Sequence, residues 1–313
     1  MLIFIAKRLI SGVILLLVVS VATFFLAHAA IGDPTVGLLG SSATAAQQEA
    51  LAAQIGTDRP LLVQFADWFG RLLAFDLGDS WRNFQPVADQ VFLRLPVTLS
   101  VVTFAIVLTA VFGAMFGVLA GLRPGTWIDK SVKGAAVVLF ALPGFWVSLV
   151  LVIWFAVQLK WFPAVGYVAP ATSLDGWLRS ITLPAVSLAL GAIVMVAEQL
   201  RNAIIAVNGL DFVRTLRSRG LSEPRVITHL LRASAPPALT VLAVMFVALL
   251  SGAVVVESIF SLSGIGTLTL GSSQNGDIPM LLGVTVIAVV FVVLVNLVLD
   301  IVLGWINPKV RVA

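Results

Sequence analysis

Long apolar stretches without charge alternate with short polar segments along this chain. Six of the stretches contain no Asp, Glu, Lys or Arg, and each holds between 18 and 28 residues: Leu9–Gly32, Leu95–Leu122, Gly134–Leu159, Ser180–Ala197, Ala233–Val256 and Ile278–Leu299. About 20 helical residues cross a hydrocarbon core of about 30 Å, and lipid offers the backbone no other hydrogen-bond partner. The pattern therefore predicts an all-α membrane protein with six transmembrane helices.

The segment between the first two stretches, residues 33–94, predicts a long helical loop outside the membrane. Thr44 begins a capping-box pattern that opens a short helix, Gly56 ends it, and Pro60 starts another. Apolar residues then recur at helical spacing up to Leu73. This amphipathic helix either lies on the membrane surface or packs on the outer ends of the spans.

Small residues and a proline mark special positions within the apolar stretches. The Pro-Gly pair at Pro143 predicts a kink or a local opening of the third span, which either lines a transport path or is only a bend. Gly113, Gly117 and Gly121 lie four residues apart and predict close packing on a neighbouring helix. A seventh uncharged stretch, Ser258–Gly276, is rich in Ser, Gly and Thr and predicts a loop or re-entrant segment.

The polar segment Leu200–Pro237 predicts a helical hairpin tip. Its signals are, in order, Asn208-Gly209 as a break, Asp211 as a cap, a short helix over Phe212–Arg219, Gly220 as its end, Ser222-Glu223-Pro224 as the start of another helix, and Pro236-Pro237 as its stop. The short helix has an apolar side and a basic side. It either sits in a groove of another protein or rests on anionic lipid.

Basic residues are distributed unevenly among the polar segments. With the N-terminus inside, thirteen of the nineteen Lys and Arg fall on inner segments. Inner loops rich in Lys and Arg predict that both termini lie inside. The chain is 60% hydrophobic and only 11% charged, so we attribute its sequence pI near 10.0 to this orientation and expect no nucleic-acid partner.

Reactive constellations are absent from the sequence. It has no Cys, and His28 and His229 are isolated from each other. It contains neither a G-x-x-x-x-G-K-[ST] phosphate loop nor a G-x-S-x-G elbow. We therefore expect no catalytic residue, no metal site and no cofactor bound by this chain.

The segment Asp211–Ser222 reads D-F-V-R-T-L-R-S-R-G-L-S. It resembles the cytoplasmic signature loop, called the EAA loop, of the permease subunits of binding-protein-dependent ABC importers. It tracks closely the D-Y-V-R-T-A-R-A-K-G-L form found in dipeptide, oligopeptide and nickel importers, with Gly220 as the glycine. The departures at Phe212, Leu216, Ser218 and Arg219 are mild, although the later I-x-L-P part of the general signature is poorly kept.

The resemblance extends over nearly the whole chain. The matching segments occur in the family's order and spacing: Gly32–Pro34, Leu77–Ser80, Leu95–Leu99, Leu142–Phe145, Trp161–Gly166, Glu257–Phe260, Gly264–Gly266 and Asn307–Arg311. The resemblance implies a subunit of an ATP-driven importer in the plasma (inner) membrane of a bacterium or archaeon, with di- or oligopeptides as the expected cargo.

The resemblance also implies partners. This chain would be the first of two different permeases and would form half of the translocation path. Two ATPase subunits, which use ATP and magnesium, would bind inside, and a solute-binding protein would dock outside. The short helix of the tip would be the coupling helix, and its ATPase-coupling residues would be Asp211, Phe212, Val213, Arg214, Thr215, Leu216, Arg217, Arg219, Gly220 and Leu221.

Three residues are candidates for the path: Glu257, Pro143 and Phe145. A carboxylate in the membrane is expected to face protein or a water-filled path, so Glu257 has two interpretations. It is either a pathway group or the partner of the Ser261–Gly266 backbone in a structural hydrogen bond, and we prefer the second.

The predicted domain organisation follows the spans: an N-terminal transmembrane helix at 1–32, an extracytoplasmic helical loop at 33–94, a permease core of helices 2–6 at 95–306 that contains the coupling loop 201–237, and a cytoplasmic tail at 307–313. An ion-gradient-driven secondary transporter is the alternative function. Such proteins often show inverted repeats and paired broken helices, whereas this sequence has one Pro-Gly break and no clear repeat.

Overall fold

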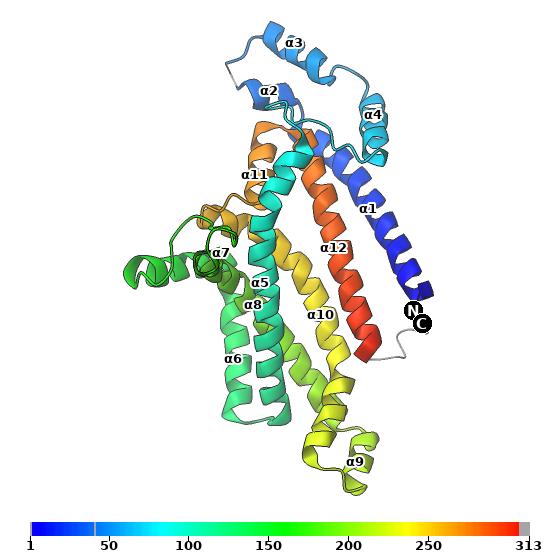
Figure 1. Ribbon diagram of the computed structural model, residues 1–313, viewed down its shortest axis with the longest axis vertical. Helices are drawn as coiled ribbons and strands as arrows, with labels where there is room; N and C mark the ends of the chain where they lie inside the picture. Colours follow the sequence, from blue (N-terminus) through cyan, green and yellow to red (C-terminus); the bar gives the residue numbers. More distant parts are fainter. Residues whose placement is uncertain (1, 41, 307–313) are drawn as a thin grey trace. The chain divides into compact units, whose positions relative to one another are not determined.

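The computed structural model describes residues 2–40 and 42–306, and its regular structure is helical (Figure 1). Within these residues, β pairing is limited to an isolated bridge between Asp79 and Pro86. The predicted tail at 307–313 lies outside the described residues. The chain divides into two compact units, of which the first comprises Met1–Ile5, Leu99–Leu262 and Leu294–Ala313, and the second Ala6–Thr98 and Ser263–Val293.

The first unit contains a helical hairpin with further helices beside it. Its elements are the later part of α5 (Val87–Leu122), α6 (Trp127–Ala141), α7 (Gly144–Leu151), a π-helical segment (Val152–Gln158), α8 (Leu174–Asn208), α9 (Asp211–Ser218) and α10 (Glu223–Ile259). α8 and α10 run side by side, and α9 joins their ends.

The second unit contains the predicted outer loop and the helices on either side of it. Its elements are α1 (Leu2–Ile31), α2 (Pro34–Leu39), α3 (Ala45–Ile55), α4 (Leu61–Leu73), the start of α5, α11 (Ile265–Asn275) and the first part of α12 (Ile278–Ile306). Asp277 is buried between these elements, where it accepts hydrogen bonds from the Ser80 hydroxyl at 2.5 Å and the Trp81 N–H at 3.1 Å. The Leu77–Ser80 turn is thereby fixed to the start of α12.

Five described helices are long and apolar enough to cross a membrane: α1, α5, α8, α10 and α12. The third predicted span is broken instead of straight. Trp127–Ala141 and Gly144–Gln158 meet at 101°, and the two halves count as a sixth span if taken together. Leu142 before the break has extended backbone, as a residue before proline prefers, and Pro143 then becomes the N-cap of α7.

One helix boundary predicted from proline is wrong. Pro236 and Pro237 do not stop the helix that begins at Glu223, because α10 continues through both to Ile259. A proline costs a helix the hydrogen bond to the carbonyl four residues earlier. Membrane helices tolerate such prolines where side chains and neighbouring helices compensate.

Other local predictions are confirmed. The Thr44 hydroxyl accepts from the Gln47 N–H and the Gln47 side chain accepts from the Thr44 N–H, which forms the capping box of α3. Gly56 ends α3 in the left-handed conformation. Within Ser258–Gly276 the structure has α11, whose 11 residues are too few to cross a membrane.

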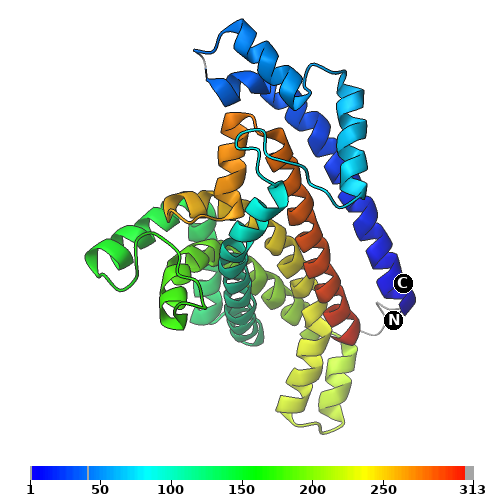
Figure 2. The same cartoon turned by 45° about the horizontal axis from the view of Figure 1, so that its top comes forward.

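The amphipathic helix α4 packs against the ends of two longer helices of its unit (Figure 2). Phe24 of α1 and Ile278 of α12 form a buried cluster that Phe65 and Trp68 of α4 cover. The Phe24 and Trp68 rings stack with centroids 5.2 Å apart. Of the two predictions for this helix, the structure favours packing on the ends of the spans.

The glycines of α5 lie against α8, as their spacing predicts. A Cβ placed on Gly113 would lie 2.9 Å from the Val196 Cβ, and one on Gly117 would lie 2.8 Å from the Ala197 carbonyl oxygen. Gly121 would bring a Cβ within 2.9 Å of the Ile204 Cβ. Real Cβ contacts essentially never fall under 3.0 Å, so the close approach of α5 to α8 requires these glycines.

Candidate functional site

The loop over residues 201–237, which the sequence predicts to be the coupling loop, folds into the tip where α8 and α10 meet, and α9 forms its end (Figures 1 and 2). Asn208 ends α8 and Gly209 follows as its cap. The short helix runs over Asp211–Ser218, one residue earlier than predicted at each end. Leu210 is its N-cap and makes no side-chain bond, so the prediction that Asp211 is the cap is wrong.

One side of α9 is buried in a small apolar core. Val213 is fully buried there, and Leu216 is packed against the same cluster. The other buried members come from α8 and α10, namely Leu200, Ile204, Val226, Leu230 and Ala238. Apolar contacts of this kind fix α9 to both long helices of its unit.

The other side of α9 is exposed and carries both apolar and charged groups. Phe212 is 42% exposed. The side chains of Arg214 and Asp211 are 75% and 96% exposed, and they form a loose ion pair at 3.7 Å. An exposed aromatic ring beside an arginine is a combination common in protein interfaces.

Arg217 braces the two sides of the loop. Its Nη2 donates to the Asn208 side-chain oxygen at 3.1 Å, and its Nε donates to the Glu223 carboxylate at 3.1 Å. Asn208 ends α8 and Glu223 begins α10. Arg217 thus connects the two chain segments that flank α9, the end of α8 and the start of α10.

Gly220 turns the chain away from α9 with φ +77°. The Leu221 N–H returns to the Leu216 carbonyl at 3.3 Å, and the Gly220 N–H bonds to the Arg217 carbonyl at 3.0 Å. No atom lies within 4 Å of the position that a Cβ would take. The glycine is therefore required by its backbone conformation, with no steric demand from neighbours.

The path candidates lie in or near a cavity of about 510 Å³ between α6, α7, α8 and α10. Phe145 lines this cavity, and Pro143 sits at the break between α6 and α7. Val256 also lines it, but the next residue, Glu257, is fully buried and does not. The structure thus brings Phe145 and the break to one cavity, whereas Glu257 is not among the residues that line it.

Comparison with known proteins bears on this arrangement. The family described as "Binding-protein-dependent transport system inner membrane component" matches residues 113–312, which is more than half of the chain. Its N-terminal companion, described as a membrane component of the same kind of system, matches residues 1–102. The chain belongs to this permease family. It is a multi-pass plasma-membrane subunit of a binding-protein-dependent ABC importer.

Relatives of the permease align over almost their full length. A Brucella abortus protein whose name assigns it to a peptide transport system is 36% identical over 308 residues, 98% of each chain. The oligopeptide transport system permease protein AppB of Bacillus subtilis is 31% identical over 312 residues, 98% of this chain and 99% of its own. A Sinorhizobium fredii protein named for a peptide ABC transporter is 30% identical over 310 residues, 99% of each.

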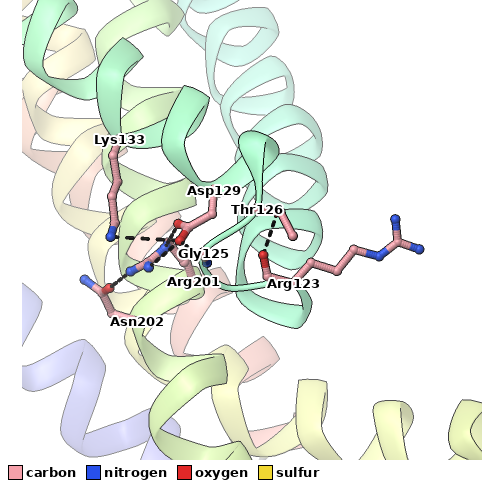
Figure 3. A network of polar contacts seen from close by, with 7 residues as sticks. All are labelled: Arg123, Gly125, Thr126, Asp129, Lys133, Arg201 and Asn202. Carbon is pink, nitrogen blue, oxygen red and sulfur yellow. Dashed lines mark hydrogen bonds and ion pairs between the residues drawn. The ribbon is translucent and has the colours of Figure 1, made fainter.

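Sequence reasoning missed one polar cluster in the permease, in which Arg201, the first residue of this loop, pairs with Asp129 (Figure 3). Asp129 at the start of α6 and Arg201 on α8 are 2% and 8% exposed. Both Asp129 oxygens accept from the Arg201 guanidinium, at Nε and, at 3.0 Å, at Nη2. The available signal was that Asp129 is the single acid among the basic residues Arg123, Lys130 and Lys133. Its partner, however, lies 72 residues away in the sequence.

No site for a metal ion is found in the part of the permease that the structure describes. Residues 2–40 and 42–306 hold no group of three or more His, Asp or Glu side chains that could bind one.

Proposed function

We propose that this permease imports peptides and that α9 is its coupling helix, which seats in a groove of a separate ATPase. The names of its relatives support a peptide cargo. The exposed face of α9, with Phe212 beside Arg214, supports the contact with the ATPase, because aromatic residues and arginine are enriched in protein interfaces. This two-faced helix is the observation that carries the proposal.

The coupling residues divide into three roles in this proposal. Phe212, Arg214 and Asp211 contact the ATPase. Val213, Leu216 and Leu221 pass the motion to α8 and α10 through the apolar core. Thr215, Arg217, Arg219 and Gly220 maintain the shape of the loop; the Thr215 hydroxyl, for example, bonds to the Asp211 carbonyl at 3.0 Å.

The complete importer contains, in this proposal, this chain as the first permease, a second homologous permease, two ATPases that hydrolyse ATP with magnesium, and a solute-binding protein outside. ATP binding closes the ATPase pair and shifts the coupling helices, and the path switches from inward-facing to outward-facing. Pro143 and Phe145 border this chain's half of the path, and the buried Glu257 stabilises the wall behind it.

Reconstitution tests the source of energy. Vesicles that contain the full complex should accumulate radiolabelled di- to pentapeptides only with ATP inside and binding protein outside. Vesicles with this chain alone should show no uptake under a proton or sodium gradient. Peptide flux through the chain alone would identify it as a secondary transporter and refute the proposal.

A glycine substitution tests the role of the loop. Gly220→Trp should leave the membrane helices folded but separate ATP hydrolysis from peptide uptake. Gly209→Trp is the matched control, because Gly209 lies in the same loop with an ordinary φ of −79°. Normal peptide uptake by the Gly220 variant would refute this role.

A further inference from the structure

We propose that Asp129 and Arg201 are a positioning pair that makes α5, α6 and α8 follow the coupling helix as one body. This inference rests on the proposed function, since it assumes that an ATPase moves α9. Neither residue contacts cargo or nucleotide in the proposal; they act through the helices that they join.

The pair is held in one geometry from several sides (Figure 3). The Gly125 N–H, in the turn between α5 and α6, donates to Asp129 Oδ2 at 2.8 Å. Arg201 Nη1 donates to the Asn202 side-chain oxygen at 2.7 Å, which fixes the plane of the guanidinium. Lys133, half exposed, lies 3.9 Å from Asp129. A two-pronged pair of this kind is directional as well as strong.

The same turns of α8 also contact the apolar cluster that holds α9. Ile204, three residues after Arg201, is buried in the cluster that contains Val213 of α9. A Cβ on Gly121 of α5 would lie 2.9 Å from the Ile204 Cβ and 3.2 Å from the Arg201 Cα. A displacement of α9 therefore reaches α8 at Ile204, and from there α5 by close packing.

Helix α6 contacts α8 through one small buried apolar cluster, made of Ala120 on α5, Val132 on α6 and Ala197 on α8. A groove of about 430 Å³ lies between α5, α6 and α8, lined on both sides by apolar residues such as Val132 and Ala197. Apolar contacts are non-directional and leave α6 able to slide along such a groove. The Asp129–Arg201 pair is the directional tie that forces α6, and with it the α6–α7 break at the cavity, to follow α8.

The ion pair with Asp129 depends on the shape of the arginine side chain at position 201. Lysine would keep the charge at position 201 but lacks the planar fork that meets both carboxylate oxygens. Arg201→Lys and Asp129→Asn therefore weaken the geometry while they preserve much of the bulk. The double variant Asp129→Arg with Arg201→Asp re-forms a pair in reverse.

The experiment uses the complete transporter in nanodiscs, to which the purified binding protein is added. The readout is the stimulation of ATP hydrolysis by the binding protein, expressed per assembled complex after gel filtration, so that loss of fold is counted separately. Coupling between distant sites typically amounts to 5–150-fold, and we expect Arg201→Lys and Asp129→Asn to lower the stimulation about fivefold or more. The reversed pair should recover part of it.

Asp175→Asn serves as the matched control. Asp175 pairs with Arg179 at 2.9 Å on the same helix, α8, but both side chains are exposed. This variant should keep the stimulation within about twofold, below the range expected for allosteric coupling.

Spin labels report the motion itself. The chain has no native Cys, so Lys130→Cys on α6 and Ala206→Cys on α8, both exposed positions, give a single label pair. In the wild type the distance should be narrow and unchanged by ATP, whereas Arg201→Lys should broaden it or make it depend on ATP.

The outcomes separate the two levels of the argument. A wild-type complex without stimulation by the binding protein would overturn the proposed function and this inference together. Normal stimulation in the wild type and in both single variants would overturn only the positioning pair, and so would a wild-type label distance that changes with ATP. If Asp129→Asn does not assemble, Arg201→Lys and the reversed pair decide the matter by the same criteria.

Discussion

Two neighbouring regions of the first unit are held together in opposite ways. Where α5, α6 and α8 meet, a row of glycines fits against the neighbouring helix and a buried ion pair closes the contact. In the coupling loop, the glycine faces open space with φ +77° and the ion pairs are exposed. Closely packed helices and a buried ion pair tolerate little displacement of one helix against the next. A backbone turn at a glycine and solvent-exposed ion pairs can instead adapt to a partner.

The largest expected effect comes from the buried pair. Asp129→Ala leaves the Arg201 guanidinium buried without its carboxylate. It should lower the free energy of unfolding by about 3 kcal/mol, the lower end of the range for broken buried pairs, because Asn202 still accepts one hydrogen bond. Unfolding of the purified chain in mixed detergent measures this. A loss no greater than that of Asp175→Ala, whose pair is exposed, would contradict it.

The glycines of α5 come next. Gly117→Ala places a Cβ 2.8 Å from the Ala197 carbonyl oxygen and should lower the free energy of unfolding by about 1–3 kcal/mol, the usual cost of overpacking. Gly134→Ala on α6 is the control, since nothing lies within 4 Å of its Cβ position. The control should be neutral or stabilise the helix by up to about 1 kcal/mol. Equal changes in the free energy of unfolding at both positions would show that side-chain volume does not determine how closely α5 packs on α8.

In the coupling loop the cost is conformational. Gly220→Ala should raise the free energy of the native loop by about 1–2 kcal/mol, the penalty for an ordinary residue in the left-handed region. Gly209→Ala, with φ −79°, should cost less. Hydrogen exchange of the amides that close the loop, Gly220 and Leu221, measures the difference. Indistinguishable exchange in the two variants would contradict the argument from φ.

The smallest effect is expected at the exposed brace. Glu223→Gln removes the ion pair with Arg217, whose side chains are 63% and 43% exposed. It should cost at most about 1 kcal/mol, and the difference from wild type should shrink at high salt because exposed charges are screened. A salt-independent loss larger than that of Asp129→Ala would reverse the ranking of the two regions.

Much of the fold could be predicted because it depends on local physics. Uncharged windows identify the helices that lipid requires, and capping residues such as Thr44 and Gly56 act on their own helix. Pro143 breaks its span as expected. Pro236 and Pro237 do not, because neighbours and side chains in a long apolar helix can compensate for a missing N–H.

The candidate site was predictable only in part, because only some of its features depend on the local sequence. The Asp211–Leu221 segment identifies the loop from its own residues, and Gly220 adopts the left-handed conformation that its place in the motif suggests. The faces of α9, and the ion pair between Asp129 and Arg201, depend on residues far away in the chain. Neither periodicity nor capping carries such information.

Site-specific photo-crosslinking at Phe212 tests the central claim most directly. A photoreactive residue at this exposed position of α9, within the assembled transporter, should form an adduct with an ATPase subunit. The same residue at the exposed Phe140 of α6 should not. Adducts with lipid alone at Phe212 would contradict the account, because the helix would then rest on the membrane surface instead of a partner.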